Sequence, residues 1–394
     1  MGRQSHWVAS AVDDTAVAWQ VYAIRHQPID LAIVGLILFA PQLLLAIPAG
    51  LLADRAERRI ICIAGAIANA AGSLVLMLLA RSGSHSLAAY YAAIAYVGVA
   101  YSLSAPAMRS VMASIVPSER YVRASALVSS VSQLSVIGGP AVAGLLIALH
   151  AWYAFAVAAL FHLIGAASFF FLRSRVPEKP GEGAATLWSD ALEGLRFIWE
   201  RKLILGAISM DLFAVLFGGA TALLPVYAST ILHVGAFGFG LLRAAPAVGA
   251  ALVAAWLVRH PIERNGGRWL LWCVCGFGIF TIVFGLSRSM PLSLFALALT
   301  GGFDMVSMVL RNALTQMGVP EMMRGRVGAV ENIFIGASNE LGMFESGTVA
   351  SLIGATGSVV AGGVATIVVI ALWSRIFPEL RTFDRLSEQY HVAS

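Results

Sequence analysis

The amino-acid sequence predicts an all-α membrane protein with about twelve transmembrane helices, arranged as two six-helix bundles. Three observations support this fold class: the composition, the series of apolar segments, and a repeat that relates the two halves of the chain. Of the 394 residues, 59% are hydrophobic and only 12% are charged, and the mean hydropathy is +0.82. Because soluble domains carry charge on roughly 25% of their residues, we expect lipid to surround most of this chain.

The apolar segments have the length of membrane-spanning helices. A bilayer core about 30 Å thick is crossed by roughly 20 apolar residues in a helix. The even number of such segments places both termini on one side of the membrane. The predicted spans cover residues 7–24, 31–53, 60–80, 87–108, 124–149, 151–172, 203–228, 238–257, 269–287, 292–313, 327–349 and 354–374.

The positions of the basic residues predict the orientation. With both termini in the cytoplasm, the outer loops hold only Arg25, Arg81 and Arg288, and Arg243 lies inside a span; all other Lys and Arg residues fall on the cytoplasmic side. Cytoplasmic loops of membrane proteins carry this kind of excess. The net charge of +5 therefore indicates a multi-pass protein of a bacterial-type inner membrane, with cytoplasmic termini, and not a nucleic-acid-binding protein.

One long polar segment separates the two halves. Residues 173–200 are rich in Pro, Gly and charged side chains and include an amphipathic stretch at 187–199. The sequence thus predicts an N-terminal six-helix bundle at 1–172, a cytoplasmic linker at 173–200, and a C-terminal six-helix bundle with a short cytoplasmic tail at 201–394.

The two predicted bundles share a sequence repeat. Parallel repeats of this kind occur in transporters whose bundles move about a site near the bilayer midplane. In this register Met1 aligns with Gly206, and the second half begins its first span earlier, so we expect the first helix to be short at its cytoplasmic end. The pairs that match at one common separation are Ala40-Pro41 with Ala245-Pro246, Val21-Tyr22-Ala23 with Val226-Tyr227-Ala228, and Gly35-Leu36 with Gly240-Leu241.

A charged loop motif follows the second span. It reads Gly50-Leu51-Leu52-Ala53-Asp54-Arg55-Ala56-Glu57-Arg58-Arg59, and it resembles the Gly-x-Leu-Ala-Asp-Arg-x-x-Arg-Arg loop of the major facilitator superfamily. The resemblance implies the major facilitator fold for the whole chain. It also implies that Asp54 latches the bundles near the start of the eleventh helix, supported by Gly50, Arg55, Arg58 and Arg59. The alternative is a loop that only sets the topology.

The fifth span contains a Gly-Pro motif. Its sequence, Gly138-Gly139-Pro140-Ala141-Val142-Ala143-Gly144, allows tight helix packing and a bend. It resembles the motif of facilitator antiporters at Gly139, Pro140 and Gly144, although Ala143 stands where a second Gly is often found. Gly and Pro are also tolerated in membrane helices generally, so a purely structural role is the alternative.

Segments near the end of the sequence indicate a particular branch of this superfamily. Three segments resemble the enterobactin-exporter-like branch of the drug–proton antiporters, which includes macrolide efflux proteins and transmembrane secretion effectors. The resemblance implies export of a siderophore or a hydrophobic drug. The segments are Gly325-Arg326-Val327, Gly336-Ala337-Ser338-Asn339-Glu340-Leu341-Gly342 and Phe377-Pro378-Glu379-Leu380-Arg381.

Charged side chains inside the predicted spans are candidate coupling sites, because a charge in the membrane is costly unless it is paired or faces water. We place Asp304 and Asp14 first, and Glu331 is a candidate partner of Arg311 at a gate. A structural ion pair is an equal alternative for each acid. The candidate acids are Asp13, Asp14, Asp211, Asp304, Glu331, Glu340 and Glu345, and the candidate counter-charges are Arg109, Arg243 and Arg311.

Polar and aromatic residues of two helices are candidates for the substrate cavity. They are Trp19, Gln20, Tyr22, Phe213 and Phe217. Packing in the core is the default alternative for such side chains. The three cysteines lie in apolar spans, so we expect neither a disulfide nor a metal site.

These patterns together predict a secondary transporter that exports a small organic molecule in exchange for protons. A facilitator-fold importer or uniporter is the alternative within the same fold. An enzyme is not expected, because hydrolase, zinc-protease and nucleotide-binding motifs are missing from the sequence. We expect no catalytic residues, no cofactor besides the proton gradient, no nucleic-acid partner, and a monomer in the lipid bilayer.

Overall fold

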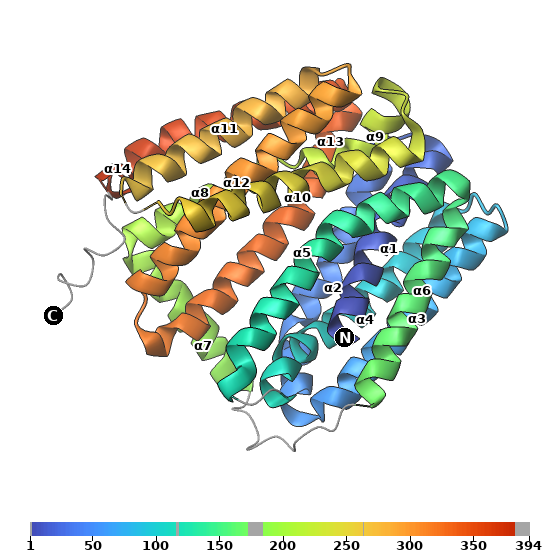
Figure 1. The fold of residues 1–394 in the computed structure, drawn as a ribbon, viewed down its shortest axis with the longest axis horizontal. Helices are drawn as coiled ribbons and strands as arrows, with labels where there is room; N and C mark the ends of the chain where they lie inside the picture. The colour runs from blue at the N-terminus through green and yellow to red at the C-terminus, as the bar shows by residue number, and fades with distance from the viewer. Residues whose placement is uncertain (1, 116–117, 172–183, 263, 383–394) are drawn as a thin grey trace. The chain divides into compact units, whose positions relative to one another are not determined.

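A computed structural model describes residues 2–115, 118–171, 184–262 and 264–382 (Figure 1). The regular structure within these ranges is helical, without a strand. Contacts divide the chain into two compact units. The first comprises Met1–Leu187 with Ala228–Ala244, and the second comprises Trp188–Tyr227 with Ala245–Ser394.

The first unit is built around the N-terminal helix. Helix α1 packs against α5 and α6, α3 packs against α4 and α6, and α2 packs against α4. Small and β-branched residues of α1, among them Val12 and Ala16, are fully buried with Tyr90 and Phe155 in one core. The helices are α1 (Gly2–Arg25), α2 (Pro28–Arg55), α3 (Arg58–Arg81), α4 (Leu87–Ile115), α5 (Ser118–Leu149) and α6 (Ala151–Phe170), and α10 (Gly235–Arg259) contributes its residues up to Ala244.

The second unit repeats this style of packing around α8. Helix α13 packs against α8 and α11, and α11 packs against α12. Its core includes Met210, Leu270 and Leu310. The elements are α7 (Ala184–Glu200), α8 (Lys202–Phe217), the 3-10 helix η1 (Ala220–Leu223), α9 (Leu224–Val226), the π-helix η2 (Tyr227–Ile231), α11 (Gly266–Leu286), α12 (Met290–Gly318), α13 (Glu321–Ile376) and α14 (Glu379–Thr382), with most of η2 belonging to the first unit.

The described helices coincide with the predicted spans. Ten of them are long and apolar enough to cross a membrane. One of the ten, α13, covers two predicted spans in its 56 residues and breaks at Gly354, whose φ of 80° and ψ of 160° are not helical. Helix α1 lies outside the ten, yet it has 24 residues, which at 1.5 Å per residue reach across a core of about 30 Å. In the repeat register Gly2 aligns with Ala207, whereas α8 begins at Lys202, so α1 is shorter at this end than its repeat counterpart, as the sequence predicts.

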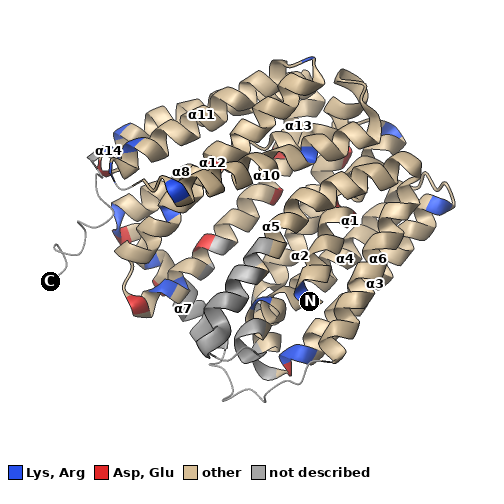
Figure 2. Cartoon of the chain, in the orientation of Figure 1, with Lys and Arg blue, Asp and Glu red and all other residues tan. Residues whose placement is uncertain are grey.

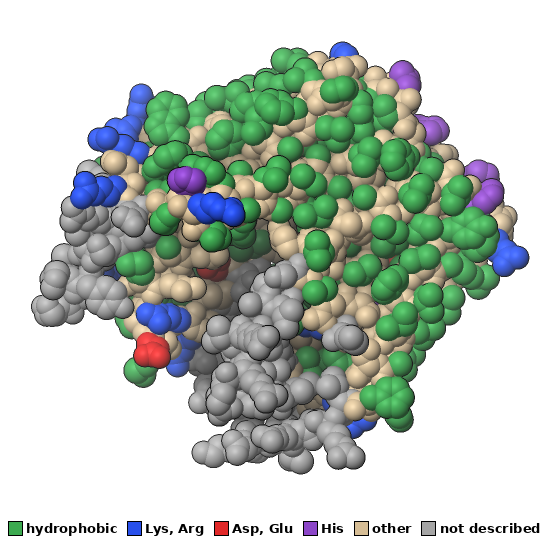
Figure 3. Space-filling view, viewed as in Figure 1, with side chains coloured by type: hydrophobic (Ala, Val, Ile, Leu, Met, Phe, Trp, Pro, Cys, Tyr) green, Lys and Arg blue, Asp and Glu red, His purple; other side chains and the backbone are tan. Residues whose placement is uncertain are grey.

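The surface of the helices is suited to lipid. Many large apolar side chains are exposed, for example Leu44 at 74% and Leu352 at 79%. Leu134 and Leu252 are each 67% exposed. Hydrophobic side chains dominate the face seen in Figure 3. Lys and Arg lie mostly at helix ends (Figure 2). Exposed apolar patches of this extent mark contact with a membrane, so the chain is a multi-pass membrane protein.

The predicted linker is described only in part. Residues 172–183 lie outside the described ranges. The amphipathic stretch forms α7, where Ile198 is fully buried against Ile204 and Val327. Glu193 of α7 accepts a hydrogen bond from Arg326 of α13 at 2.7 Å. The second half of this linker thus packs on the start of α13.

Candidate functional site

The predicted gating loop connects α2 and α3. Gly50 lies near the end of α2, which ends at Arg55, and Arg58 begins α3. The side chains of Asp54 and Arg55 lie outside the described residues, so the predicted latch stays a prediction.

Arg59 in the same loop contacts the end of α6. Its Nε donates to the carbonyl oxygen of Phe169 at 3.1 Å, and its Nη2 donates to that of Phe170. The guanidinium also lies 5.8 Å from the Phe170 ring centroid. A cation that donates to the last carbonyls of a helix satisfies groups that have no partner within the helix. Arg59 therefore caps the C-terminus of α6.

Replacing Arg59 with Gln is expected to lower the stability of the first unit by about 1–2 kcal/mol, because a cation at the C-terminus of a helix contributes up to about 2 kcal/mol in a partly buried site. The melting temperature of the purified protein in detergent would report the loss. Arg58→Gln, one residue earlier in the loop, is the matched control. Equal melting temperatures for the two variants would contradict the capping role.

The Gly-Pro motif of α5 lies where helices approach closely. A methyl group added at Gly139 would lie 2.6 Å from Cβ of Ala11 in α1. One added at Gly144 would lie 2.7 Å from Cα of Gly240 and 2.8 Å from the carbonyl oxygen of Ala236, both in α10. Both glycines are therefore required for backbone approach.

A buried polar cluster connects α1, α3 and α6. Asp13 accepts a 2.5 Å hydrogen bond from the Ser73 hydroxyl, and its Oδ2 lies 3.4 Å from Nε2 of His162. Nδ1 of His162 lies 2.9 Å from Nδ1 of His6. All four side chains are buried. Asp13 is a residue that the sequence predicts, whereas neither histidine is, although His162 lies inside a predicted span.

Asp14 follows the buried Asp13 but is itself exposed. It interacts electrostatically with Arg243 of α10. The predicted acid and its predicted counter-charge thus act on each other within the first unit.

The predicted cavity residues of α1 contact three neighbouring elements, α4, η2 and α10. Trp19 stacks on Phe239 of α10 with ring centroids 5.5 Å apart. The Tyr22 hydroxyl lies 3.1 Å from the Thr230 hydroxyl, and the Gln20 amide donates to the Tyr90 hydroxyl at 3.2 Å.

In the second unit, one arginine interacts electrostatically with three carboxylates. Nη1 of Arg311 in α12 lies 2.6 Å from Oδ2 of Asp211 in α8. Asp304, two turns earlier in α12, and Glu331 in α13 also interact electrostatically with Arg311. Arg311, Asp211 and Glu331 are buried, and Asp304 is half-buried. Arg311 therefore interacts with Glu331, its predicted partner, but its close ion pair is with Asp211.

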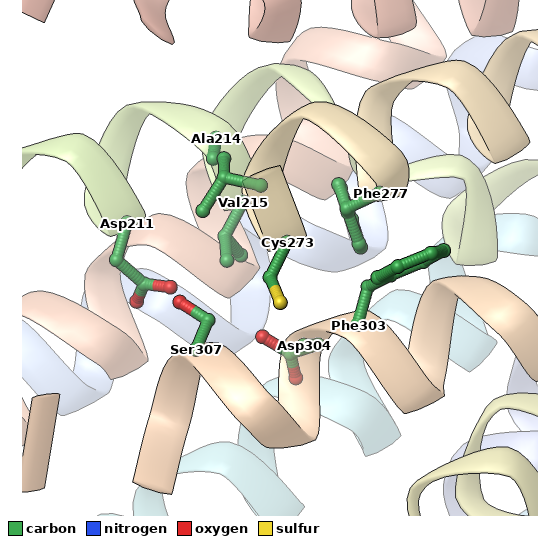
Figure 4. A pocket seen from close by; sticks show the side chains of 9 residues that line it. Asp211, Ala214, Val215, Cys273, Phe277, Phe303, Asp304 and Ser307 are labelled. Carbon is green, nitrogen blue, oxygen red and sulfur yellow. The ribbon is translucent and has the colours of Figure 1, made fainter. Parts of the chain in front are cut away.

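A small pocket between α8, α11 and α12 contains part of this cluster. Figure 4 shows the Asp211, Asp304 and Ser307 side chains pointing into it. No described residue hydrogen-bonds the Ser307 hydroxyl. The pocket is lined by Asp211, Ala214, Val215, Cys273, Val274, Phe277, Phe303, Asp304 and Ser307.

The remaining predicted residues lie apart from these clusters. Phe213 and Phe217 stack on each other, and Phe213 also meets Trp373, so both contact the core of the second unit. Glu340 is half-buried in α13. Arg109 is exposed on α4 and forms no ion pair with a described residue.

Known proteins resemble this chain over most of its length. The family model of transmembrane secretion effectors matches residues 5–392. The enterobactin exporter EntS of Shigella dysenteriae serotype 1 is 27% identical over 346 residues, which cover 86% of this chain and 81% of the exporter. The exporter of the same name from Escherichia coli O157:H7 matches with the same identity and coverage.

Solved transporter structures share the fold. A bacterial homologue of the iron transporter ferroportin in an inward-facing state aligns with a TM-score of 0.72 and 18% identity over 97% of both chains. A bacterial homologue of the human lysosomal transporter Spinster aligns with a TM-score of 0.72 and 16% identity, over 96% of this chain and 97% of that one. A POT family transporter in complex with 5-aminolevulinic acid gives 0.73 and 11% over 96% of both. At such identities the likeness concerns the fold alone.

Proposed function

Because this chain belongs to the transmembrane secretion effector family of the major facilitator superfamily, we propose that it exports a siderophore-like organic molecule from the cytoplasm and that inward proton flow drives export. The family makes the chain a secondary transporter and not an enzyme. The enterobactin exporters among its relatives support the substrate class.

The charge cluster of the second unit is the observation that supports proton coupling. With Asp211, Asp304 and Glu331 all ionised, one guanidinium would face three carboxylates in helices of a membrane protein. Such an excess of negative charge away from water is costly, and each bound proton reduces it. Asp304 is the best placed of the three to exchange a proton, because it lines the pocket and Asp211 holds the close contact with Arg311.

The transport cycle in this proposal is alternating access. The parallel repeat supports two six-helix bundles, at 1–172 and 201–394, that are joined by the segment 173–200 and move about a central site. The basic residues support cytoplasmic termini in a bacterial inner membrane, and we propose that the chain works as a monomer.

Everted membrane vesicles with an acidic interior test this proposal. Addition of enterobactin is expected to dissipate the pH gradient reported by a fluorescent probe, because substrate entering the vesicle exchanges for protons. Asp304→Asn is expected to reduce the response by about 100-fold or more, a typical contribution of a positioned proton acceptor.

Glu200→Gln is the matched control, because Glu200 is an exposed acid that pairs only with the exposed Arg196 among the described residues. Macrolides and cationic dyes extend the substrate panel. A folded wild-type protein that responds to no compound would contradict proton exchange. A response to macrolides alone would contradict the siderophore class, and an unchanged response in Asp304→Asn would contradict the coupling role.

A further inference from the structure

The histidine and aspartate cluster of the first unit has the geometry of a proton relay, and we propose that His6, His162 and Asp13 carry a proton from the first turns of α1 into the interior of this unit. This inference deepens the proposed function, since a proton-driven exporter needs a path for the proton. Chains of Asp, Glu and His inside membrane helices mark such paths in pumps and transporters.

The order of contacts indicates which ring nitrogen of each histidine carries the proton. Nε2 of His162 faces the Asp13 carboxylate at 3.4 Å, so the proton of a neutral His162 is best placed on Nε2. Its Nδ1 is then an acceptor for the contact of 2.9 Å with Nδ1 of His6. Neutral His6 therefore carries its proton on Nδ1 and leaves Nε2 bare.

The two ends of this chain have no hydrogen-bond partner among the described residues. They are Nε2 of His6 and Oδ1 of Asp13. Both ends of this chain of contacts are acceptors. This arrangement suits a relay, because a proton must enter at one end and leave at the other.

One transfer along the chain takes three proton steps. A proton binds Nε2 of His6, the Nδ1 proton of His6 moves to Nδ1 of His162, and the Nε2 proton of His162 moves to Asp13. Each histidine is neutral before and after the transfer, and the Asp13 carboxylate becomes a carboxylic acid. The net change is one proton taken up at the His6 end and held on Asp13.

Ser73 lets Asp13 exist in both charge states. The Ser73 hydroxyl lies 2.5 Å from Oδ2 of Asp13 and 3.1 Å from the backbone oxygen of Asn69. When Asp13 is ionised, the hydroxyl donates to the carboxylate. When Asp13 is protonated, the acid donates to Ser73 Oγ and the hydroxyl donates to Asn69. The buried hydroxyl is satisfied in either state, as a reversible proton site requires.

The surroundings of the relay are consistent with transfer beyond Asp13. Tyr101 of α4 stacks on His6 with ring centroids 6.2 Å apart, and the neighbouring charged groups are Asp14 and Arg243. Asp14 interacts electrostatically with both Asp13 and Arg243, and it is exposed. Asp14 is therefore the carboxylate to which Asp13 would pass the proton.

The test follows the proton itself and needs no substrate. Purified protein in lipid nanodiscs would be exposed to a photochemical acid jump, and time-resolved infrared spectroscopy would record the carboxylic acid band of Asp13, assigned by its absence in Asp13→Asn. The rate of Asp13 protonation is expected to fall by about 100-fold in His6→Gln and in His162→Gln. His85→Gln, at an exposed histidine, should retain the wild-type rate.

Each result decides the inference. An unchanged rate in both relay variants would overturn it, because the proton would then reach Asp13 by another route. A wild-type protein that never shows the Asp13 band would overturn it as well. If His162→Gln does not fold, His6→Gln at the other end of the chain still tests the relay. The two experiments can also fail separately. If both histidine variants slow Asp13 protonation but enterobactin leaves the pH gradient of the vesicles intact, the relay stands and the proposed function fails.

Discussion

Replacing Arg311 with Met is expected to destabilise the second unit by about 3–5 kcal/mol, the cost of leaving one member of a buried ion pair without its partner. Arg311 and Asp211 are each only 5% exposed, and their charged atoms lie 2.6 Å apart. Asp304 and Glu331 lose the same counter-charge. The expected result is a large drop in melting temperature and in the fraction of monodisperse protein recovered in detergent.

Two further variants show whether the pair causes this loss. Arg268→Met removes an exposed arginine at the start of α11 and should leave the melting temperature nearly unchanged. The double variant Asp211→Asn with Arg311→Met should recover part of the stability, because no ionised Asp211 is left without a partner. A double variant as unstable as Arg311→Met alone would show that the Asp211 contact is not the source of the loss.

Gly144→Ala is expected to have the second largest effect. The added methyl group would overlap backbone atoms of Gly240 and Ala236 in α10, and backbone cannot move aside as a flexible side chain can. Overpacking of a tight contact costs about 1–3 kcal/mol. We expect a lower melting temperature and loss of the substrate-induced pH response in everted vesicles, since the helices must separate to fit the methyl group.

Gly138→Ala is a closely matched control for this change. It introduces the same methyl group in the same helix, where no heavy atom lies within 4 Å. Alanine also has a higher helix propensity than glycine, by about 1 kcal/mol, so Gly138→Ala should be neutral or stabilising. Comparable losses in the two variants would point to a general sensitivity of α5 and not to the contact with α10.

The sequence predicted the helices well because their signal is local. Each span is an apolar run of membrane length, and even the break at Gly354 falls where two predicted spans meet. Pairing between helices is not local. The electrostatic interaction of Asp14 with Arg243 agrees with the predicted counter-charge, but the close contact of Arg311 with Asp211 depends on how α8 and α12 pack, which no spacing in the sequence reveals.

The histidine cluster shows the same limit. His6 and His162 are 156 residues apart in the sequence, and neither alone indicates a contact with the other. Only the close packing of α1 on α6 brings His162 into contact with both His6 and Asp13. The amphipathic pattern of the linker did predict α7, while its docking through Glu193 and Arg326 again required the three-dimensional structure.

The ion pair of Arg311 and Asp211 also has a consequence for biosynthesis. Translation proceeds from the N-terminus, so Asp211 is made about 100 residues before Arg311. At about 5–20 residues per second, this interval lasts roughly 5–20 s. During this interval α8 carries an acid that costs about 2.5–3.5 kcal/mol at the centre of an inserting helix. The segment Lys202–Ile231 has a hydropathy of 2.0, which favours insertion before the partner exists. The apolar residues of α8 thus serve the nascent chain as well as the finished fold.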